Sequence, residues 1–285
     1  METMKIDGTA DSPVIRSRRI TGGAGTSLHV TETGNENGRP VLFVHGLSQC
    51  ALAWRKQLRS PLGNDLRLVA MDLRGHGQSE RPADGYDDQS NWADDIHSVI
   101  STLGLERPVL CGWSYGGVVI GDYIRRYGEG AIGGICLVGA VSRLGEPVMP
   151  FLGPKFIATL PGLFSEELEA SSKAVQDFIH ATTSGAPTFE EFCLTFGYVS
   201  LVAPYVRQAL LGRVINHDDV FERLTSPVLI AHGLDDEIVL SAMSDHLAGL
   251  IPHAKSSYYE GVGHAPFLES PGRFNAELLA FSSGV

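Results

Sequence analysis

Hydrophobic and polar positions divide the chain into parts with different rhythms. Residues 14–20 and 27–33 alternate between apolar and polar side chains around a glycine-rich turn, which predicts a β-hairpin at the edge of a sheet. Short, continuously apolar runs follow, and such runs are typical of strands that are buried on both faces of a parallel sheet. These runs lie at residues 41–44, 66–71, 109–111, 132–138 and 228–231.

Stretches with helical periodicity lie between these runs, at residues 90–103 and 118–127 among others. In the first of them, Ile96, Val99 and Leu103 recur at spacings of three and four residues and therefore share one helix face. Alternation of buried strands with amphipathic helices predicts an α/β fold with a doubly wound, mostly parallel sheet.

The alternation stops between residues 142 and 221, a stretch that is rich in Phe, Leu and Pro and contains no apolar run typical of a buried strand. Compact domains rarely contain a structureless loop of that length, so we predict an inserted helical cap at 142–221. The core domain would comprise residues 1–141 and 222–285. Aromatic residues of the cap are expected either to line an apolar pocket or to form the cap's own core, and they are Phe151, Phe156, Phe164, Phe178, Phe192, Phe196 and Tyr198.

Composition and charge narrow the protein's class and its partners. The 285 residues include 43% hydrophobic and 19% charged residues, as expected for a soluble globular protein, and the net charge of −11 argues against a nucleic-acid or membrane partner. Cys50, Cys111, Cys136 and Cys193 form no C-x-x-C pair, and we expect buried, reduced thiols in strands. Residues 1–13 do not resemble a signal peptide, so a cytoplasmic location is expected.

The clearest chemical motif is Gly112-Trp113-Ser114-Tyr115-Gly116, which stands between a predicted strand and a predicted helix. A turn tight enough to present a serine strains the backbone there, and glycines two residues before and after it relieve the crowding. The N-terminus of the following helix favours nearby negative charge. The motif therefore predicts that Ser114 is a nucleophile.

A serine hydroxyl becomes a strong nucleophile only when a base accepts its proton. His264 suits this role because it lies on a loop between a predicted strand at 256–260 and a predicted helix at 273–281. The imidazole in turn needs a carboxylate, and Asp235 and Asp236 follow the apolar run at 228–231. All these residues follow predicted strands, at the edge where open α/β sheets gather their ligands.

The sequence offers no metal or cofactor motif. The histidines lack H-E-x-x-H spacing, the acidic residues around Asp236 lack the calcium-loop pattern, and no phosphate-binding glycine loop follows a strand. We therefore expect neither a metal site nor a cofactor.

These motifs make the chain resemble the α/β-hydrolase superfamily over nearly all of residues 14–282 apart from the cap. The segment VLFVHGL at 41–47 is similar to the family's strand and oxyanion loop, and MDLRGHGQS at 71–79 to its turn after the next strand. In the family the acid stands three residues after the glycine of HG-x-x-D, which selects Asp236 over Asp235. The resemblance also implies an oxyanion hole formed by the backbone N–H groups of Leu47 and Tyr115.

The same resemblance implies structural roles for three other histidines. His45 would support the oxyanion loop, His76 would order the turn at 71–79, and His232 is also expected to be structural. The segments around Ser114 and His264 are similar to those of acyl-homoserine lactonases and general esterases. Residues beside these two positions are expected to border the substrate pocket, and they are Trp113 and Phe267.

A serine at the nucleophile position disfavours epoxide hydrolases and haloalkane dehalogenases, which carry aspartate there. It implies a hydrolase that cleaves a carboxylic ester or lactone with an apolar acyl or aromatic group through an acyl-enzyme. Alternatives with the same triad are an acyl-homoserine lactonase, a cofactor-free haloperoxidase or perhydrolase and a C–C bond hydrolase. A ligand receptor that retains the fold is the non-enzymatic alternative.

Overall fold

A computed structural model describes residues 14–285, and residues 1–13, where no signal peptide is expected, lie outside the described part. An eight-stranded sheet has the order β1-β2-β4-β3-β5-β6-β9-β10. The pairs β1–β2 and β2–β4 are antiparallel, and all other neighbouring pairs are parallel. The strands are β1 (Arg16–Thr21), β2 (Ser27–Gly34), β3 (Arg39–Val44), β4 (Leu66–Met71), β5 (Val109–Trp113), β6 (Gly134–Val138), β9 (Val228–Gly233) and β10 (Lys255–Tyr259).

Both faces of this sheet are covered. Successive strand residues point to opposite faces, and in β3 the pair Leu42 and Val44 belongs to one hydrophobic cluster while Val41 and Phe43 belong to another. All four side chains are fully buried. The prediction of strands buried on both faces is therefore confirmed, as is the doubly wound α/β fold.

Helices pack against the two faces of the sheet. One cluster contains buried residues of α2 (Gln89–Leu103), α3 (Gly116–Tyr127), α8 (Asp218–Glu222) and α9 (Ala242–Leu250). The other contains buried residues of α1 (Arg55–Leu58), α10 (Pro266–Glu269) and α11 (Pro271–Ser283). Among residues 14–285, no helix is both long and apolar enough to cross a membrane.

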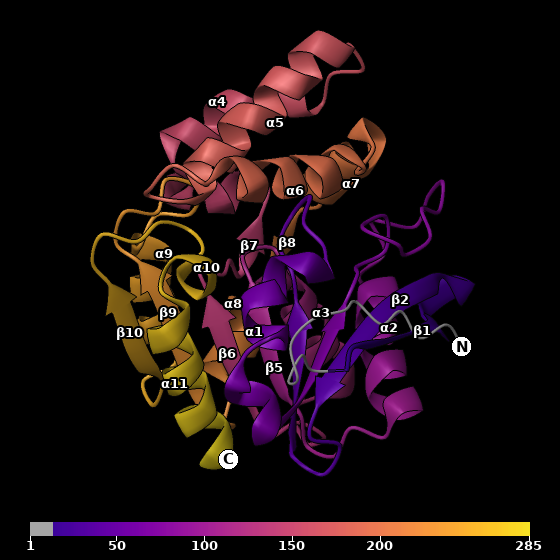
Figure 1. The fold of residues 1–285 in the computed structure, drawn as a ribbon, viewed down its shortest axis with the longest axis vertical. Coiled ribbons are helices and arrows are strands. Elements are labelled where there is room, and N and C mark those ends of the chain that lie inside the picture. Colours follow the sequence, from indigo (N-terminus) through magenta and orange to yellow (C-terminus); the bar gives the residue numbers. More distant parts are fainter. Residues whose placement is uncertain (1–13) are drawn as a thin grey trace.

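The segment between β6 and β9 contains a separate group of helices, which lies beyond one end of the sheet (Figure 1). Its helices are α4 (Pro154–Leu163), α5 (Leu168–Thr182), α6 (Phe189–Ser200) and α7 (Pro204–Leu211). A two-stranded antiparallel sheet at its base joins β7 (Arg143–Leu144) to β8 (Ile215–Asn216). This pairing escapes sequence analysis because each strand has only two residues.

The cysteines depart from the expectation. All four are free, but only Cys111 and Cys136 lie in strands, as neighbours on β5 and β6. Cys50 is buried in the loop after β3, and Cys193 is exposed on α6. The expectation of buried thiols is wrong for Cys193, because α6 directs this residue away from the packed face of its helix.

Candidate active site

Ser114 occupies a strained turn between β5 and α3. Its φ angle is +55°, a left-handed conformation that residues with a side chain rarely adopt. The flanking glycines are required by space: a Cβ on Gly112 would lie 2.6 Å from Ile120 Cδ1, and one on Gly116 would lie 2.5 Å from the Val44 carbonyl oxygen. The local sequence thus folds into the turn that the motif predicts.

Asp236 and His264 are in direct contact. His264 Nδ1 lies 2.6 Å from Asp236 Oδ2, and both residues are buried. The other carboxylate oxygen, Asp236 Oδ1, accepts hydrogen bonds from the backbone N–H groups of Ile238 at 2.8 Å and Val239 at 2.9 Å. Asp235 is exposed to solvent. The structure therefore pairs His264 with Asp236.

Asp236 is a carboxylate rather than a carboxylic acid in this setting. Burial alone would raise the pKa of the Asp236 carboxyl, but the nearby charge of His264 and hydrogen bonds from His232 and His264 hold that pKa well below its usual value. His232 Nε2 lies 3.1 Å from Asp236 Oδ2, and its Nδ1 lies 2.6 Å from Ser244 Oγ. The structural role expected of His232 is thus to hold the carboxylate.

Residues next to Ser114 in the chain and in the sheet contact the His264–Asp236 pair. Trp113 Nε1 donates a hydrogen bond of 2.8 Å to the His264 carbonyl oxygen. The N–H of Ser114 donates to the Val138 carbonyl oxygen at 3.0 Å, and a Cβ on the next residue, Gly139, would lie 3.0 Å from His264 Nδ1. In residues 14–285, however, no hydrogen bond joins the Ser114 hydroxyl to His264; such bonds are often long before substrate binds.

The backbone N–H groups of Leu47 and Tyr115 lie beside Ser114. Both residues line the same cavity as Ser114, and a Cβ on Gly46 would lie 3.0 Å from Ser114 Cβ. Within the described part of the chain, neither N–H donates a hydrogen bond to a protein group. The two donors are therefore free to bind an oxygen atom of a ligand.

The cavity at Ser114 is apolar and small, with a volume of about 40 Å³. Phe156 and Phe178 of the cap line this cavity, as expected for cap aromatics that border an apolar pocket. The remaining cap and core residues around the cavity are aliphatic: Val141, Leu144, Val148, Leu152, Leu211, Ile238 and Val239.

A larger cavity of about 370 Å³ has a lining that does not include Ser114. Trp113, expected at the substrate pocket, lines this cavity instead. Phe267 lies in the core, fully buried and stacked on Trp54 with ring centroids 4.1 Å apart, and it lines neither cavity.

Two buried histidines hold the loops around the site. His45 Nε2 accepts the Leu73 N–H at 3.0 Å, and His76 Nε2 accepts the Ser48 N–H at 3.2 Å. Burial lowers the pKa of His45 to about 4 and that of His76 to about 3, so both rings are neutral. Over residues 14–285, no group of three His, Cys, Asp or Glu side chains is placed to hold a metal ion.

Arg207 is a buried arginine of α7 that was not among the predicted site residues. Its guanidinium donates to Ser48 Oγ at 3.1 Å and to the carbonyl oxygens of Leu163 at 3.1 Å and Val199 at 2.7 Å. Ser48 follows Leu47 and has a φ angle of +59°. Arg207 thus ties the cap to the loop that carries the Leu47 N–H. No sequence signal marks it, because arginines on helices are usually exposed.

Comparison with known proteins shows the family to which the chain belongs. The model of the "Alpha/beta hydrolase family" matches residues 41–277. A non-heme chloroperoxidase of Streptomyces lividans is 30% identical over 277 residues, covering 92% of this chain and 98% of that protein. The bifunctional esterase/perhydrolase DCH of Acinetobacter calcoaceticus is 28% identical, with the same coverage of 92% and 98%.

Among solved structures, the esterase RhEst1 from Rhodococcus sp. ECU1013 superposes with a TM-score of 0.90 and 39% identity, covering 94% of this chain and 98% of that one. The family match extends over most of the chain, and it includes the turn at Ser114 and the loops after β9 and β10 that carry Asp236 and His264. The protein therefore belongs to the α/β-hydrolase family.

Proposed function

We propose that the protein is a serine esterase that cleaves carboxylic esters or lactones through an acyl-enzyme on Ser114. One observation carries this proposal: a strained serine and two unpartnered backbone N–H groups meet at one cavity, beside a buried His264–Asp236 pair. The relatives named esterase support it, because they share both the family and nearly the whole length of the chain.

The geometry supports a defined division of roles. Asp236 accepts a hydrogen bond from the N–H at His264 Nδ1, which leaves Nε2 of the same ring free to accept the proton of Ser114. Ser114 Oγ attacks the carbonyl carbon, and the oxyanion accepts hydrogen bonds from the N–H groups of Leu47 and Tyr115. Collapse expels the alcohol, which takes the proton from His264. Water then attacks the acyl-enzyme in the same way and releases the acid.

The apolar cavity indicates which part of the substrate it receives. Leu47 and Tyr115 line it, so the carbonyl oxygen and its acyl chain belong there. A volume of about 40 Å³ corresponds to roughly three water-sized groups, which favours a short acyl chain such as acetyl or butyryl.

The decisive experiment is reaction with a fluorophosphonate probe and with p-nitrophenyl acetate. We expect stoichiometric labelling of Ser114, located by peptide mass spectrometry, and turnover that Ser114→Ala reduces by at least about 1,000-fold. Ser101→Ala, on the exposed end of α2, is the matched control and should retain full activity. A wild-type chain that neither labels nor turns over, or an active Ser114→Ala variant, would refute the proposal.

A second candidate is perhydrolysis, in which hydrogen peroxide replaces water in the attack on the acyl-enzyme. Relatives named chloroperoxidase and esterase/perhydrolase favour it, since each aligns over nearly its whole length with this chain. The test is peracetic acid formation from acetate and hydrogen peroxide, with Ser114→Ala as the control. Ester hydrolysis without any peracid would eliminate this candidate.

A further inference from the structure

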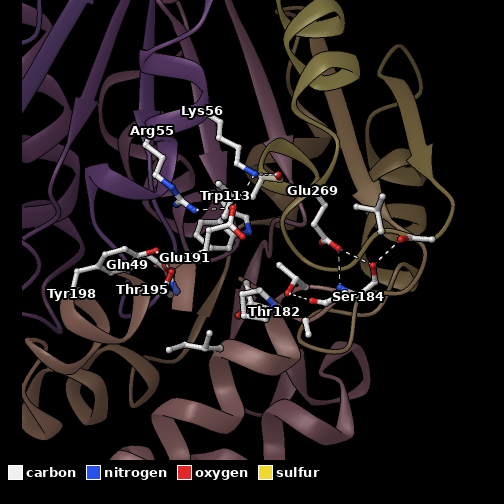
Figure 2. Close-up of a pocket in the computed structure, with 18 residues that line it drawn as sticks. Gln49, Arg55, Lys56, Trp113, Thr182, Ser184, Glu191, Thr195, Tyr198 and Glu269 are labelled. Carbon is white, nitrogen blue, oxygen red and sulfur yellow. Dashed lines mark hydrogen bonds and ion pairs between the residues drawn. The ribbon is translucent and has the colours of Figure 1, made fainter. Parts of the chain in front are cut away.

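Figure 2 shows the lining of the larger cavity, which includes Gln49, Trp113 and Thr182. Its lining comes from segments that flank each reacting group. Gln49 stands two residues after Leu47, and Trp113 directly precedes Ser114. The carbonyl of Thr182, another lining residue, accepts the backbone N–H of His264 at 2.9 Å. The larger cavity therefore borders the chain segments that carry Leu47, Ser114 and His264.

A buried polar side chain at this cavity lacks a hydrogen-bond partner. Gln49 is only 2% exposed, yet its carboxamide makes no hydrogen bond with any group in residues 14–285. Folded proteins satisfy nearly all such groups, and an exception in a cavity calls for a ligand. The Gln49 carboxamide supplies both donors and an acceptor to such a ligand.

The charges around the cavity cancel. Lys56 Nζ lies 3.1 Å from Glu191 Oε1 and donates to a backbone carbonyl at 2.8 Å. Glu269 accepts from the Ser184 N–H at 2.8 Å and from its hydroxyl at 2.7 Å. Arg55 and Lys56 are thus balanced by Glu191 and Glu269, all four lining the cavity. A neutral ligand suits this setting better than an anion or a cation does.

We infer that this cavity binds a polyhydroxy alcohol, of which glycerol is the simplest, as the leaving group of the ester. This inference rests on the proposed esterase function. A hydroxyl group both donates and accepts hydrogen bonds, so neighbouring hydroxyls of one neutral polyol can accept from the Gln49 amide group and donate to its oxygen. The preferred substrates are short-chain monoesters of polyols, with the acyl chain in the apolar cavity and the polyol beside Gln49.

A matched pair of substrates tests this inference. Glycerol 1-monobutyrate and propyl butyrate share the acyl group and the three-carbon alcohol, and they differ only in two hydroxyls. We expect the wild-type protein to have a kcat/KM at least about threefold higher for the glycerol ester. Gln49→Leu removes the carboxamide and should lower the ratio of the two kcat/KM values about three- to tenfold, the effect typical of one lost hydrogen bond.

Gln208→Leu is the matched control, because it makes the same change on the exposed face of α7, where Gln208 Nε2 bonds to a backbone carbonyl at 3.0 Å. It should leave the ratio unchanged. A wild-type ratio near one, or an equal effect of both variants on the ratio, would overturn the inference.

Acyl transfer in the wild-type protein provides a test that needs no variant. In this reaction the alcohol oxygen attacks the butyryl carbonyl, the bond to Ser114 Oγ breaks, and Ser114 regains its proton. With glycerol and 1-propanol at equal concentration, we expect at least about threefold more glycerol ester than propyl ester per hydroxyl group. Equal partition would overturn the inference.

The two proposals fail in different ways. If Ser114 is labelled by the fluorophosphonate probe and p-nitrophenyl acetate is hydrolysed while the polyol preference is absent, only the leaving-group assignment fails. If labelling and turnover are both absent, the esterase proposal itself fails, and the inference with it.

Discussion

Replacing Asp236 by Asn would test the proposed triad while changing almost nothing in shape. Asp236 Oδ1 accepts the N–H groups of Ile238 and Val239 at 2.8 and 2.9 Å. The amide of Asn must keep its oxygen at this position, because an NH2 group there would face two donors. Its NH2 group then points at His264 Nδ1, where Oδ2 now lies at 2.6 Å.

This orientation determines the size of the effect. A donor facing His264 Nδ1 stabilises the tautomer that carries its proton on Nε2, and that nitrogen can no longer accept the proton of Ser114. The same substitution in the serine-protease triad lowers kcat about 10⁴-fold. Each tenfold loss equals about 1.36 kcal/mol of activation free energy, so we expect a loss of about 5 kcal/mol here.

The assay is hydrolysis of p-nitrophenyl acetate by Asp236→Asn, with Asp235→Asn as the matched control. The neighbouring Asp235 is exposed, so the control should stay within about twofold of the wild-type rate. Far-ultraviolet circular dichroism should show that both variants fold. A rate for Asp236→Asn above about a tenth of the wild-type value would refute the reasoning, and a collapse in the control alone would assign the role to Asp235.

Other features of the structure lead to three further predictions. Burial lowers the pKa of His45 to about 4 and of His76 to about 3, so the unfolded chain binds more protons than the folded one below about pH 6.5. The contribution of these histidines to the free energy of unfolding should be fully present above that pH, and it should be about 2 kcal/mol smaller per histidine at about pH 5. Equal urea midpoints at pH 7.5 and pH 5 would contradict this prediction. Gly139→Ala would place a Cβ 3.0 Å from His264 Nδ1, at a residue whose φ angle is +48°. We expect kcat to fall at least about tenfold, because small misplacements near reacting groups are costly. An unchanged kcat would show that the His264 ring can move aside. Cys193, as the exposed thiol, should react with a disulfide reagent in the native state ahead of the three buried ones, whereas four equally fast thiols would mean that the native chain opens readily.

Much of the fold follows from local sequence. Runs of apolar residues fix strands that are buried on both sides, because each strand must cover two faces with side chains. The hairpin expected at 14–20 and 27–33 is present as β1 and β2. The turn at Ser114 is partly local, since the space around Gly112 is limited by Ile120 of the helix that follows the turn. These features depend on neighbours in the chain, and the sequence records them directly.

Contacts between distant segments depend on the tertiary structure. The sequence presents Asp235 and Asp236 side by side, and only the packing of β9 against β10 places the second of them on His264. Likewise, nothing in the sequence distinguishes Arg207 from other helical arginines, and only the packing of α7 near Ser48 gives it this partner.

The sequence by itself determined the sheet and the turn at Ser114, because each follows largely from local periodicity or local space. Tertiary structure alone decided the two cavities, the unpartnered Gln49 and the cap contact of Arg207. The physical reason is that a cavity is bounded by segments from across the chain. Its shape and its unsatisfied polar groups exist only when those segments are packed together.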